Sequence, residues 1–368
     1  MTLRQVWYKI QLVILAVFLM ALHPLSIAAD IGEEVISPWA MCQLKTVIHD
    51  YFKLDLEENI QINLLTGGYG ATSVRLDIAD KSYVLRVINE QESPERINTE
   101  IFAMKNAAEI GVAPAIHWIS DNGHAILMDY IPGKTLSMEC GKRLEVMAKV
   151  ADLLRQVHAL PKNTFNAPSF SGHMEQFYRK YSTKSSDPAT WDIAISIIRE
   201  GAVLLQELES PSVNTHGDLN PRNILISSQG LYFIDWSEEM YTEPFHDLVY
   251  FSILMDYDSD DDAFLLKSYL QKSPSSNEKK RFLIAKKMNF GRLALGGLYI
   301  GDKLKSVTQG ADDIPPQLED WSYYAKAFAN NDTPLTSQFF LDLAQVAIKS
   351  ANAIDVSKPP EEICQKDF

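Results

Sequence analysis

A histidine, a carboxylate and an asparagine occur in this chain at a spacing with a specific chemical use. Residues 215–225 read THGDLNPRNIL, so that Asp218 follows His216 by two positions and precedes Asn223 by five. A later run, LYFIDW, places Asp235 at the end of an apolar segment. Phosphoryl transfer needs one carboxylate to orient a hydroxyl and receive its proton, and a separate amide and carboxylate to hold Mg²⁺ against nucleotide phosphates. Asp218 fits the first role, and Asn223 with Asp235 fits the second.

The residues between Asn223 and Asp235 predict a short hairpin. Two apolar runs, 224–226 and 231–234, flank the turn-forming sequence SSQG. A hairpin brings the two ends of its sequence together, so the amide and the carboxylate should meet although they are separated along the chain. The alternative is a solvated loop followed by an ordinary hairpin with an acidic end.

These motifs resemble those of the kinase-like small-molecule phosphotransferases, which include aminoglycoside phosphotransferases and choline/ethanolamine kinases. The catalytic loop of that family runs His-x-Asp-x-x-x-x-Asn, and its metal-binding segment reads Ile-Asp-Trp or Ile-Asp-Phe, as residues 234–236 do here. The resemblance implies an α+β, two-lobed protein-kinase-like fold, with a small antiparallel β lobe carrying one long helix and a larger, mainly helical lobe. It also implies ATP and Mg²⁺ as cofactors. By motif it covers residues 60–248.

Alternating apolar residues predict three strands near the start of this region. The segments 60–65 and 71–78 flank a glycine-containing turn, and the segment 82–88 carries Arg86 among apolar residues. Protein kinases have a phosphate-contacting lysine at the position of Arg86, and a guanidinium can also bind phosphate bidentately. The alternative is an arginine that reaches solvent. Because glycine lets the main chain approach phosphates closely, the resemblance assigns nucleotide binding to Gly67, Gly68 and Gly70, for which a simple tight turn is the alternative.

A helix is predicted to begin at Pro94, with Ser93 as its N-cap. In the resembled family a carboxylate on this helix pairs with the cation of the third strand. Glu100 lies next to the apolar stripe of the helix and is favoured for this role over Glu95. A glutamate that faces solvent is the alternative.

The segment 125–133 resembles the hinge of the family, where backbone groups near Asp129 and Ile131 would contact the adenine edge. Beyond it the chain is predicted to be mostly helical, with a loop rich in Pro, Ser, Gly and Asn between about residues 161 and 188. Residues 1–29 are expected to be a signal peptide or membrane anchor, and residues 40–131 a nucleotide-binding lobe. Residues 132–355 are expected to form a catalytic and substrate lobe, and residues 356–368 a tail.

The segment after Asp235 matches the family in part. Pro244 and Asp247 stand at the spacing of its Pro-x-x-Asp-Leu pattern, but Ser237 replaces the usual glutamate. Asp247 is expected to brace the catalytic loop from the start of a helix. His216 is expected to brace it by hydrogen bonding and not to react.

The acceptor is the least constrained part of the prediction. Trp321, Tyr323 and Tyr324 could surround a quaternary ammonium by cation–π attraction, with core packing as the alternative. The resemblance implies transfer to a hydroxyl of a small molecule, in particular an amino alcohol such as choline or ethanolamine. An aminoglycoside or sugar is an alternative acceptor, and a nucleotide-binding protein without turnover is an alternative of another class.

Charge and cysteine content exclude some partners. The formal net charge of −14 argues against a nucleic-acid partner, which would need basic patches. This net charge is compatible with a cationic substrate, but an acidic surface that only aids solubility is the more common explanation. The acidic run 256–262 predicts a solvated helix start, with cation binding as the alternative. The three cysteines have no metal-ligand spacing and are expected to be unpaired and mostly buried, with a single disulfide bridge as the alternative.

Residues 1–29 resemble a targeting segment. Arg4 and Lys9 precede an apolar run that ends near small residues, which is typical of a signal peptide cleaved after Ala28 or of a membrane anchor. Membrane contact is expected only through this segment. Export conflicts with a requirement for ATP, so a start at Met41 in the cytoplasm is the alternative.

Overall fold

The computed structural model describes residues 36–54, 60–65, 71–165, 168–185, 187–308, 319–330 and 336–359. The predicted signal or anchor segment, the three glycines of the predicted phosphate-covering turn and Cys364 lie outside these ranges. Within them, no helix combines the length and the apolar character needed to cross a membrane. Cys42 is exposed and Cys140 is half-buried, and both are free thiols. The expectation of mostly buried thiols was therefore wrong for Cys42.

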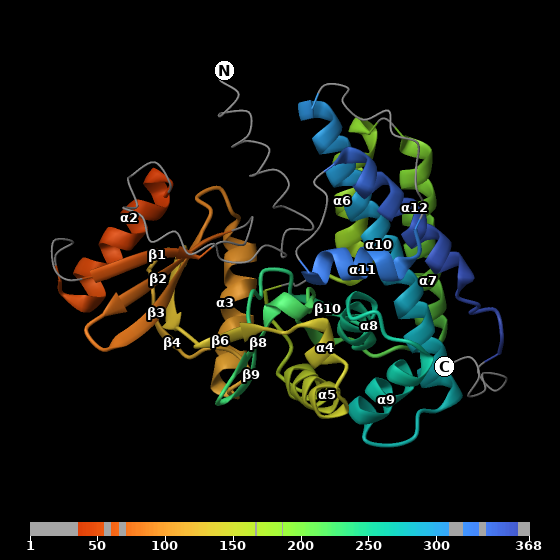
Figure 1. The fold of residues 1–368 in the computed structure, drawn as a ribbon, viewed down its shortest axis with the longest axis horizontal. Coiled ribbons are helices and arrows are strands. Elements are labelled where there is room, and N and C mark those ends of the chain that lie inside the picture. The colour runs from red at the N-terminus through yellow and green to blue at the C-terminus, as the bar shows by residue number, and fades with distance from the viewer. Residues whose placement is uncertain are drawn as a thin grey trace.

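The first lobe is an antiparallel sheet with helices beside it (Figure 1). The strand order is β1-β2-β3-β5-β4. The alternating segments predicted from sequence form the first strands, because their apolar positions fill the core of the sheet lobe. The elements are α2 (Pro38–Val47), the π-helix η1 (Ile48–Phe52), β1 (Ile60–Leu65), β2 (Ala71–Ile78), β3 (Lys81–Ile88), α3 (Pro94–Glu109), β4 (Ile116–Ile119) and β5 (Ala125–Asp129).

The long helix α3 begins where the sequence predicts. The Ser93 hydroxyl accepts a hydrogen bond from the Arg96 N–H, which caps the first turn, and Pro94 occupies the first helical position. Ile97 and Met104 are buried on the face that packs into the core shared with the second lobe. That packing fixes the side of the helix that carries Glu100.

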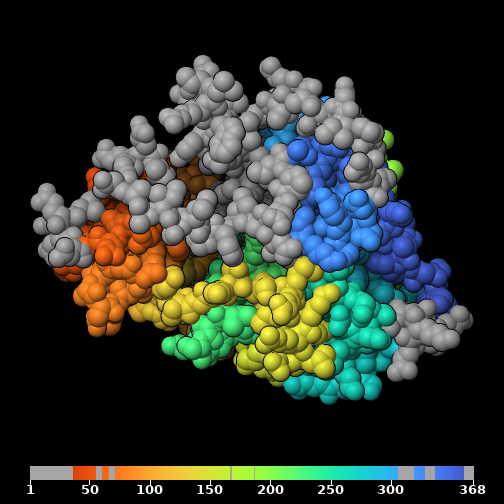
Figure 2. All heavy atoms as spheres, in the orientation of Figure 1, coloured from red at the N-terminus to blue at the C-terminus, as the bar shows by residue number. Residues whose placement is uncertain are grey.

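The second lobe is mainly helical and is built around α10, which packs against α7, α8 and α12. In Figure 2 the yellow and green middle of the chain lies between the orange sheet lobe and the teal and blue helices. The helices are α4 (Met138–Gly141), α5 (Leu144–His158), α6 (Phe170–Tyr181), the 3-10 turn η2 (Ser182–Lys184), α7 (Pro188–Glu207), the 3-10 turn η3 (Pro221–Asn223), α8 (Phe245–Leu254), α9 (Ser259–Leu270), α10 (Ser276–Thr308), α11 (Trp321–Asn330) and α12 (Ser337–Ala353).

One segment differs from the prediction. The region expected to be a loop up to residue 188 contains helix α6. The Ser169 hydroxyl caps it by accepting from the Gly172 N–H, and Phe170 with Met174, four residues apart, are its buried side chains. Phe177, Tyr178 and Tyr181 also pack against the core, so the apolar residues of α6 recur at helical spacing. The helix was missed because the surrounding Pro, Ser, Gly and Asn residues were interpreted as one long loop.

Short strands bring the catalytic loop and the segment around Asp235 together. The predicted hairpin is present, with Ile224 opposite Phe233, so its open end carries Asn223 on one side and Asp235 on the other. A separate pair joins the strand before the loop to the strand after Asp235. The strands are β6 (Gly133–Thr135), β7 (Val213–Thr215), β8 (Ile224–Ser227), β9 (Gly230–Phe233) and β10 (Met240–Thr242). The predicted α+β, two-lobed fold is confirmed.

Candidate active site

The carboxylate of Asp247 holds the start of the catalytic loop. One of its oxygens accepts from the His216 N–H at 2.7 Å and the other from the Gly217 N–H at 2.9 Å. His158 Nε2 donates to the same carboxylate at 3.1 Å. Burial alone would raise the pKa of Asp247, but the hydrogen bonds from His158 and from the loop outweigh it and hold the pKa below its usual range. Asp247 is thus an ionised brace at the first turn of α8, as its position in the sequence predicts.

His216 joins the loop to the segment before Asp235. Its Nε2 lies 3.0 Å from the Ile234 carbonyl oxygen, so this nitrogen must be the protonated donor. The other ring nitrogen then accepts from the Asp218 N–H at 3.3 Å. Burial lowers the pKa of His216, which keeps the ring neutral. Both ring nitrogens make structural hydrogen bonds, as expected for a residue that braces the loop.

Gly217 is required where two stretches of main chain meet. Its φ is +79°, and a Cβ added there would lie 1.7 Å from the Glu238 carbonyl oxygen. Only glycine can occupy this position without displacing the loop. The close approach places the segment after Asp235 directly against the residue that precedes Asp218.

Asp218 is almost fully buried, with 3% of its side chain exposed. The side-chain amides of Asn220 and Asn223 each donate to its Oδ2 at 3.1 Å. Arg292, from the distant helix α10, reaches its Oδ1 at 3.4 Å. Burial raises the pKa of Asp218 to about 7, although the nearby guanidinium of Arg292 lowers it in part. An oriented carboxylate with a pKa near neutrality is suited to accept a proton.

The two predicted metal ligands lie at one end of the hairpin. The Ile234 N–H donates to the Asn223 carbonyl oxygen at 2.9 Å, which links the two sides. The Asn223 side-chain nitrogen donates to Asp218, so its side-chain oxygen is the atom suited to a metal. Asp235 has a φ of +63° and accepts from the Ser237 hydroxyl at 2.9 Å. One carboxylate and one amide oxygen fit Mg²⁺, which takes its remaining ligands from phosphates and water.

Arg86 connects the sheet lobe to this end of the hairpin. Its Nε donates to Glu100 on α3 at 2.6 Å, and its Nη2 donates to Asp235 at 3.0 Å. The arginine and Glu100 side chains are only 9% and 4% exposed, whereas Glu95 is exposed. Burial would lower the pKa of Arg86, but the two carboxylates outweigh it and raise the pKa above its usual value. Arg86 is therefore a charged, anchored group and does not reach solvent.

The other predicted nucleotide contacts are less defined. The Asp129 N–H donates to the Ala115 carbonyl oxygen at 2.9 Å within the sheet, and its carboxylate pairs with His117 at 2.6 Å. Ile131 follows in the connection between the lobes and is half-buried. Gly67, Gly68 and Gly70 lie outside the described residues, so their role over the phosphates stays a prediction.

Several charged residues near the site were not predicted. Glu238 accepts from Arg96 on α3 at 2.5 Å and from His173 on α6 at 3.2 Å. Burial would raise the pKa of Glu238, but these partners outweigh it and hold the pKa below its usual range. The same arginine donates to the Ser237 carbonyl oxygen at 2.9 Å. The family pattern has a glutamate where Ser237 stands, and the acidic residue one position later was the available signal.

The aromatic residues considered for a cationic acceptor pack into the helical lobe. Trp321 donates its indole N–H to the Ile253 carbonyl oxygen at 2.8 Å and lies edge-on to Phe290. Tyr324 is 1% exposed and belongs to the core, whereas Tyr323 is 44% exposed. Core packing, the alternative left open by the sequence, therefore describes Trp321 and Tyr324.

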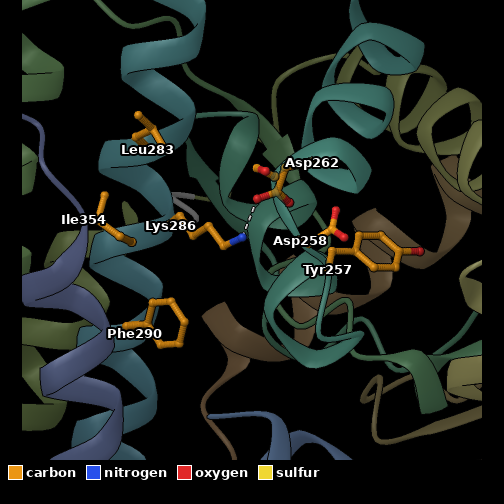
Figure 3. A pocket seen from close by; sticks show the side chains of 8 residues that line it. Tyr257, Asp258, Asp262, Leu283, Lys286, Phe290 and Ile354 are labelled. Carbon is orange, nitrogen blue, oxygen red and sulfur yellow. Dashed lines mark hydrogen bonds and ion pairs between the residues drawn. The ribbon is translucent and has the colours of Figure 1, made fainter. Parts of the chain in front are cut away.

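A hollow of about 210 Å³ lies between α9, α10 and the segment after α12, and is separate from the catalytic loop (Figure 3). Lys286 forms an ion pair with Asp262 on its wall. The Ser252 hydroxyl also donates to Asp262, at 2.5 Å. In the same acidic run, Asp258 caps α9 by accepting from two backbone N–H groups. Asp258 and Asp262 therefore serve the start and packing of a helix, which favours a helix start over cation binding. Asp262 is only 5% exposed, so the expectation that the run is solvated was wrong for this residue.

The sequence and the fold of this chain are similar to those of known phosphotransferases. The model of the phosphotransferase enzyme family matches residues 61–277, more than half of the chain. A choline/ethanolamine kinase family protein from Mesorhizobium loti is 20% identical, with a TM-score of 0.57 over 83% of this chain and 99% of that one. An ethanolamine kinase from Plasmodium vivax is 13% identical, with a TM-score of 0.61 over 84% and 86%.

An aminoglycoside phosphotransferase, APH(2")-IIia, solved with GDP and kanamycin, is 13% identical with a TM-score of 0.54, over 79% of this chain and 98% of that one. A search of the curated proteins found no match. At these sequence identities the solved structures support the fold alone. Membership of the family rests on the match of the family model to residues 61–277. This chain belongs to the phosphotransferase enzyme family.

Proposed function

We propose that the protein transfers the γ-phosphoryl group of Mg-ATP to a hydroxyl of a small molecule, with Asp218 as the catalytic residue. The proposal rests on two neighbouring contacts: Asn223 donates to Asp218, and Arg86 donates to Asp235. The buried carboxylate of Asp218 orients the acceptor hydroxyl and receives its proton. When bound, Mg²⁺ neutralises the charge on the nucleotide phosphates.

The remaining residues divide between the metal and the nucleotide. Asn223 and Asp235 would hold Mg²⁺ through oxygen atoms. Arg86, fixed by Glu100, would bind phosphate. We assign backbone contacts with adenine to Asp129 and Ile131, and the cover over the phosphates to Gly67, Gly68 and Gly70. A choline kinase from Streptococcus pneumoniae was solved with AMP, which supports a nucleotide site in this fold.

For the acceptor we propose an amino alcohol such as choline or ethanolamine. The names of similar structures, choline and ethanolamine kinases, support this choice. Glu238 affects the ionisation of Asp218, but its charge is already shared with Arg96 and His173, so it adds no separate argument for an ammonium. Trp321 and Tyr324 give no support, because they pack into the core.

An acceptor screen tests this proposal. ADP formation and the phosphorylated product are measured with choline, ethanolamine, kanamycin and simple sugars at equal concentrations, with Asp218→Ala as the blank. We expect the highest kcat/KM with choline or ethanolamine. If only kanamycin or a sugar were phosphorylated, the proposed amino-alcohol acceptor would be wrong, whereas the proposed phosphoryl transfer would stand. ATP binding without product from any acceptor would favour a nucleotide-binding protein without turnover.

A further inference from the structure

Arg292 enters the site from a part of the chain remote from every motif. It lies in α10, 74 residues beyond Asp218, and its side chain is 15% exposed. Its Nη1 donates to the Gly217 carbonyl oxygen at 2.6 Å, and its Nη2 lies 3.4 Å from Asp218 Oδ1. One guanidinium thus contacts the main chain just before Asp218 and also the carboxylate of Asp218.

Tyr250 on α8 fixes the position of this guanidinium. The Arg292 guanidinium carbon lies 4.3 Å from the centre of the Tyr250 ring, within the range of cation–π attraction. Tyr250 also interacts with Asp218, because burial raises the pKa of the Tyr250 hydroxyl and the charge of the neighbouring carboxylate raises it further. The tyrosine is 9% exposed, so both contacts are largely shielded from water. Arginine, tyrosine and aspartate therefore form one packed group from three separate elements.

These contacts complement those on the other side of the carboxylate. Asn220 and Asn223 donate to Oδ2 of Asp218, whereas Arg292 contacts Oδ1. Asp247 accepts from the Gly217 N–H, and Arg292 donates to the Gly217 carbonyl. Without Arg292, a buried carbonyl and one carboxylate oxygen would lose a donor, and such losses are costly inside a protein. The loop could then shift the carboxylate away from its present direction.

We infer that Arg292, supported by Tyr250, is a positioning residue that fixes the direction of the Asp218 carboxylate for phosphoryl transfer. The inference rests on the proposed function, and it adds a residue that no motif of the sequence marks. Arg292 acts through Asp218 and needs no contact with nucleotide or acceptor. Its loss should therefore reduce kcat and leave the KM for Mg-ATP unchanged.

The same helix offers a matched control. Arg281 also lies on α10, is 13% exposed, and pairs with a buried carboxylate, Glu243, at 2.7 Å. Its guanidinium carbon lies 4.8 Å from the centre of the Phe245 ring. Arg281→Met therefore removes the same kind of ion pair and aromatic contact without touching the catalytic loop. It separates a loss of stability from a loss of positioning.

The experiment compares Arg292→Met, Arg292→Lys and Arg281→Met in the full chain. A misplacement of about 1 Å can cost on the order of 100-fold in rate, so we expect kcat to fall about 10- to 100-fold for Arg292→Met. Arg292→Lys, which keeps one donor, should recover part of this loss. Arg281→Met should keep kcat while its melting temperature falls. Hydrogen–deuterium exchange of the 214–224 peptide should rise in Arg292→Met and not in Arg281→Met.

Two results would overturn the inference. One is an unchanged kcat with unchanged exchange of the 214–224 peptide in Arg292→Met. The other is a raised KM for the acceptor at normal kcat, which would make Arg292 a substrate-binding residue. Failure of the proposed function is distinct, because it would show as no transfer by the wild type, and the exchange comparison would still test whether Arg292 holds the loop.

Discussion

Buried carboxylates around the catalytic loop differ in what stabilises them. Asp247 is held ionised by hydrogen bonds from His158 and from the loop, and Glu243 pairs with Arg281. Glu239, four residues after Asp235 and 4% exposed, accepts a hydrogen bond from Asn163 at 2.6 Å. Burial raises its pKa to about 8, and the bond from the asparagine offsets only part of this effect. Glu239 is therefore protonated at pH 7 in the folded protein.

This protonation predicts a pH-dependent effect of Glu239→Gln. The folded state keeps the proton up to about pH 8, whereas the unfolded chain loses it near its usual pKa. The contribution of Glu239 to the free energy of unfolding is therefore fully present below pH 4 and is lost as the pH rises to about 8. Glutamine keeps the hydrogen-bonding oxygen and cannot ionise, so it should raise the melting temperature at pH 8 and change it little at pH 4. The gain is a few kcal/mol at most, at about 1.4 kcal/mol per pKa unit.

Thermal unfolding of both proteins at pH 4, 6 and 8 measures this effect. The difference in melting temperature should grow steadily across the series. A difference that is the same at every pH would mean that ionisation of Glu239 does not contribute to it.

At the scale of elements, the catalytic loop depends on close contact between two segments. The first turn of α8 holds its amides through Asp247, and α10 holds a carbonyl through Arg292. Strand β7, which precedes the loop, pairs with β10, which follows Glu238, and this pairing brings Gly217 against the Glu238 main chain. The loop is thus defined by elements that follow it in the sequence as much as by its own residues.

Gly217→Ala tests this contact. A Cβ at this position would lie 1.7 Å from a backbone oxygen, which a side-chain rotation cannot relieve. We expect the loop to move and kcat to fall at least as far as in Arg292→Met. The melting temperature should also fall.

Gly111→Ala is the control for backbone strain. Gly111 has a similar φ of +73°, but nothing lies within 4 Å of an added Cβ. It should cost about 1–2 kcal/mol of stability from the left-handed conformation and leave kcat unchanged. Equal kcat values for the two variants would contradict the steric account of Gly217.

On the scale of the whole molecule, charged pairs connect the two lobes at the site. Arg86 of β3 reaches Asp235, and Arg96 of α3 reaches Glu238. Both arginines come from the sheet lobe, and both carboxylates follow the hairpin of the helical lobe. These pairs therefore hold the sheet lobe against the segment that contains Asp235 and Glu238.

The sequence predicted features that local patterns encode. Alternation identified the strands of the sheet lobe, Ser93 and Pro94 marked the start of α3, and two apolar runs marked the hairpin that brings Asn223 to Asp235. The pairing between Arg86 and Glu100 followed from the resemblance and is present.

Other features depend on packing between distant segments. Arg292 reaches Asp218 only because α10 packs against α8, and no pattern near either residue records that contact. Helix α6 is a different case, because its apolar residues recur at helical spacing and were overlooked among the surrounding Pro, Ser, Gly and Asn residues. The aromatic group around Trp321 was ambiguous because the same side chains suit a cation or a core, and the packing of α11 decides between them.

The central claim is that Asp218 acts in the transfer of the phosphoryl group and not in binding the nucleotide. Mg-ATP affinity and turnover, measured side by side for the wild type, Asp218→Ala and Asp235→Ala, test it most directly. Asp218→Ala should bind Mg-ATP like the wild type and form no product, whereas Asp235→Ala should bind it more weakly because a metal ligand is lost. Turnover by Asp218→Ala at the wild-type rate would contradict the account.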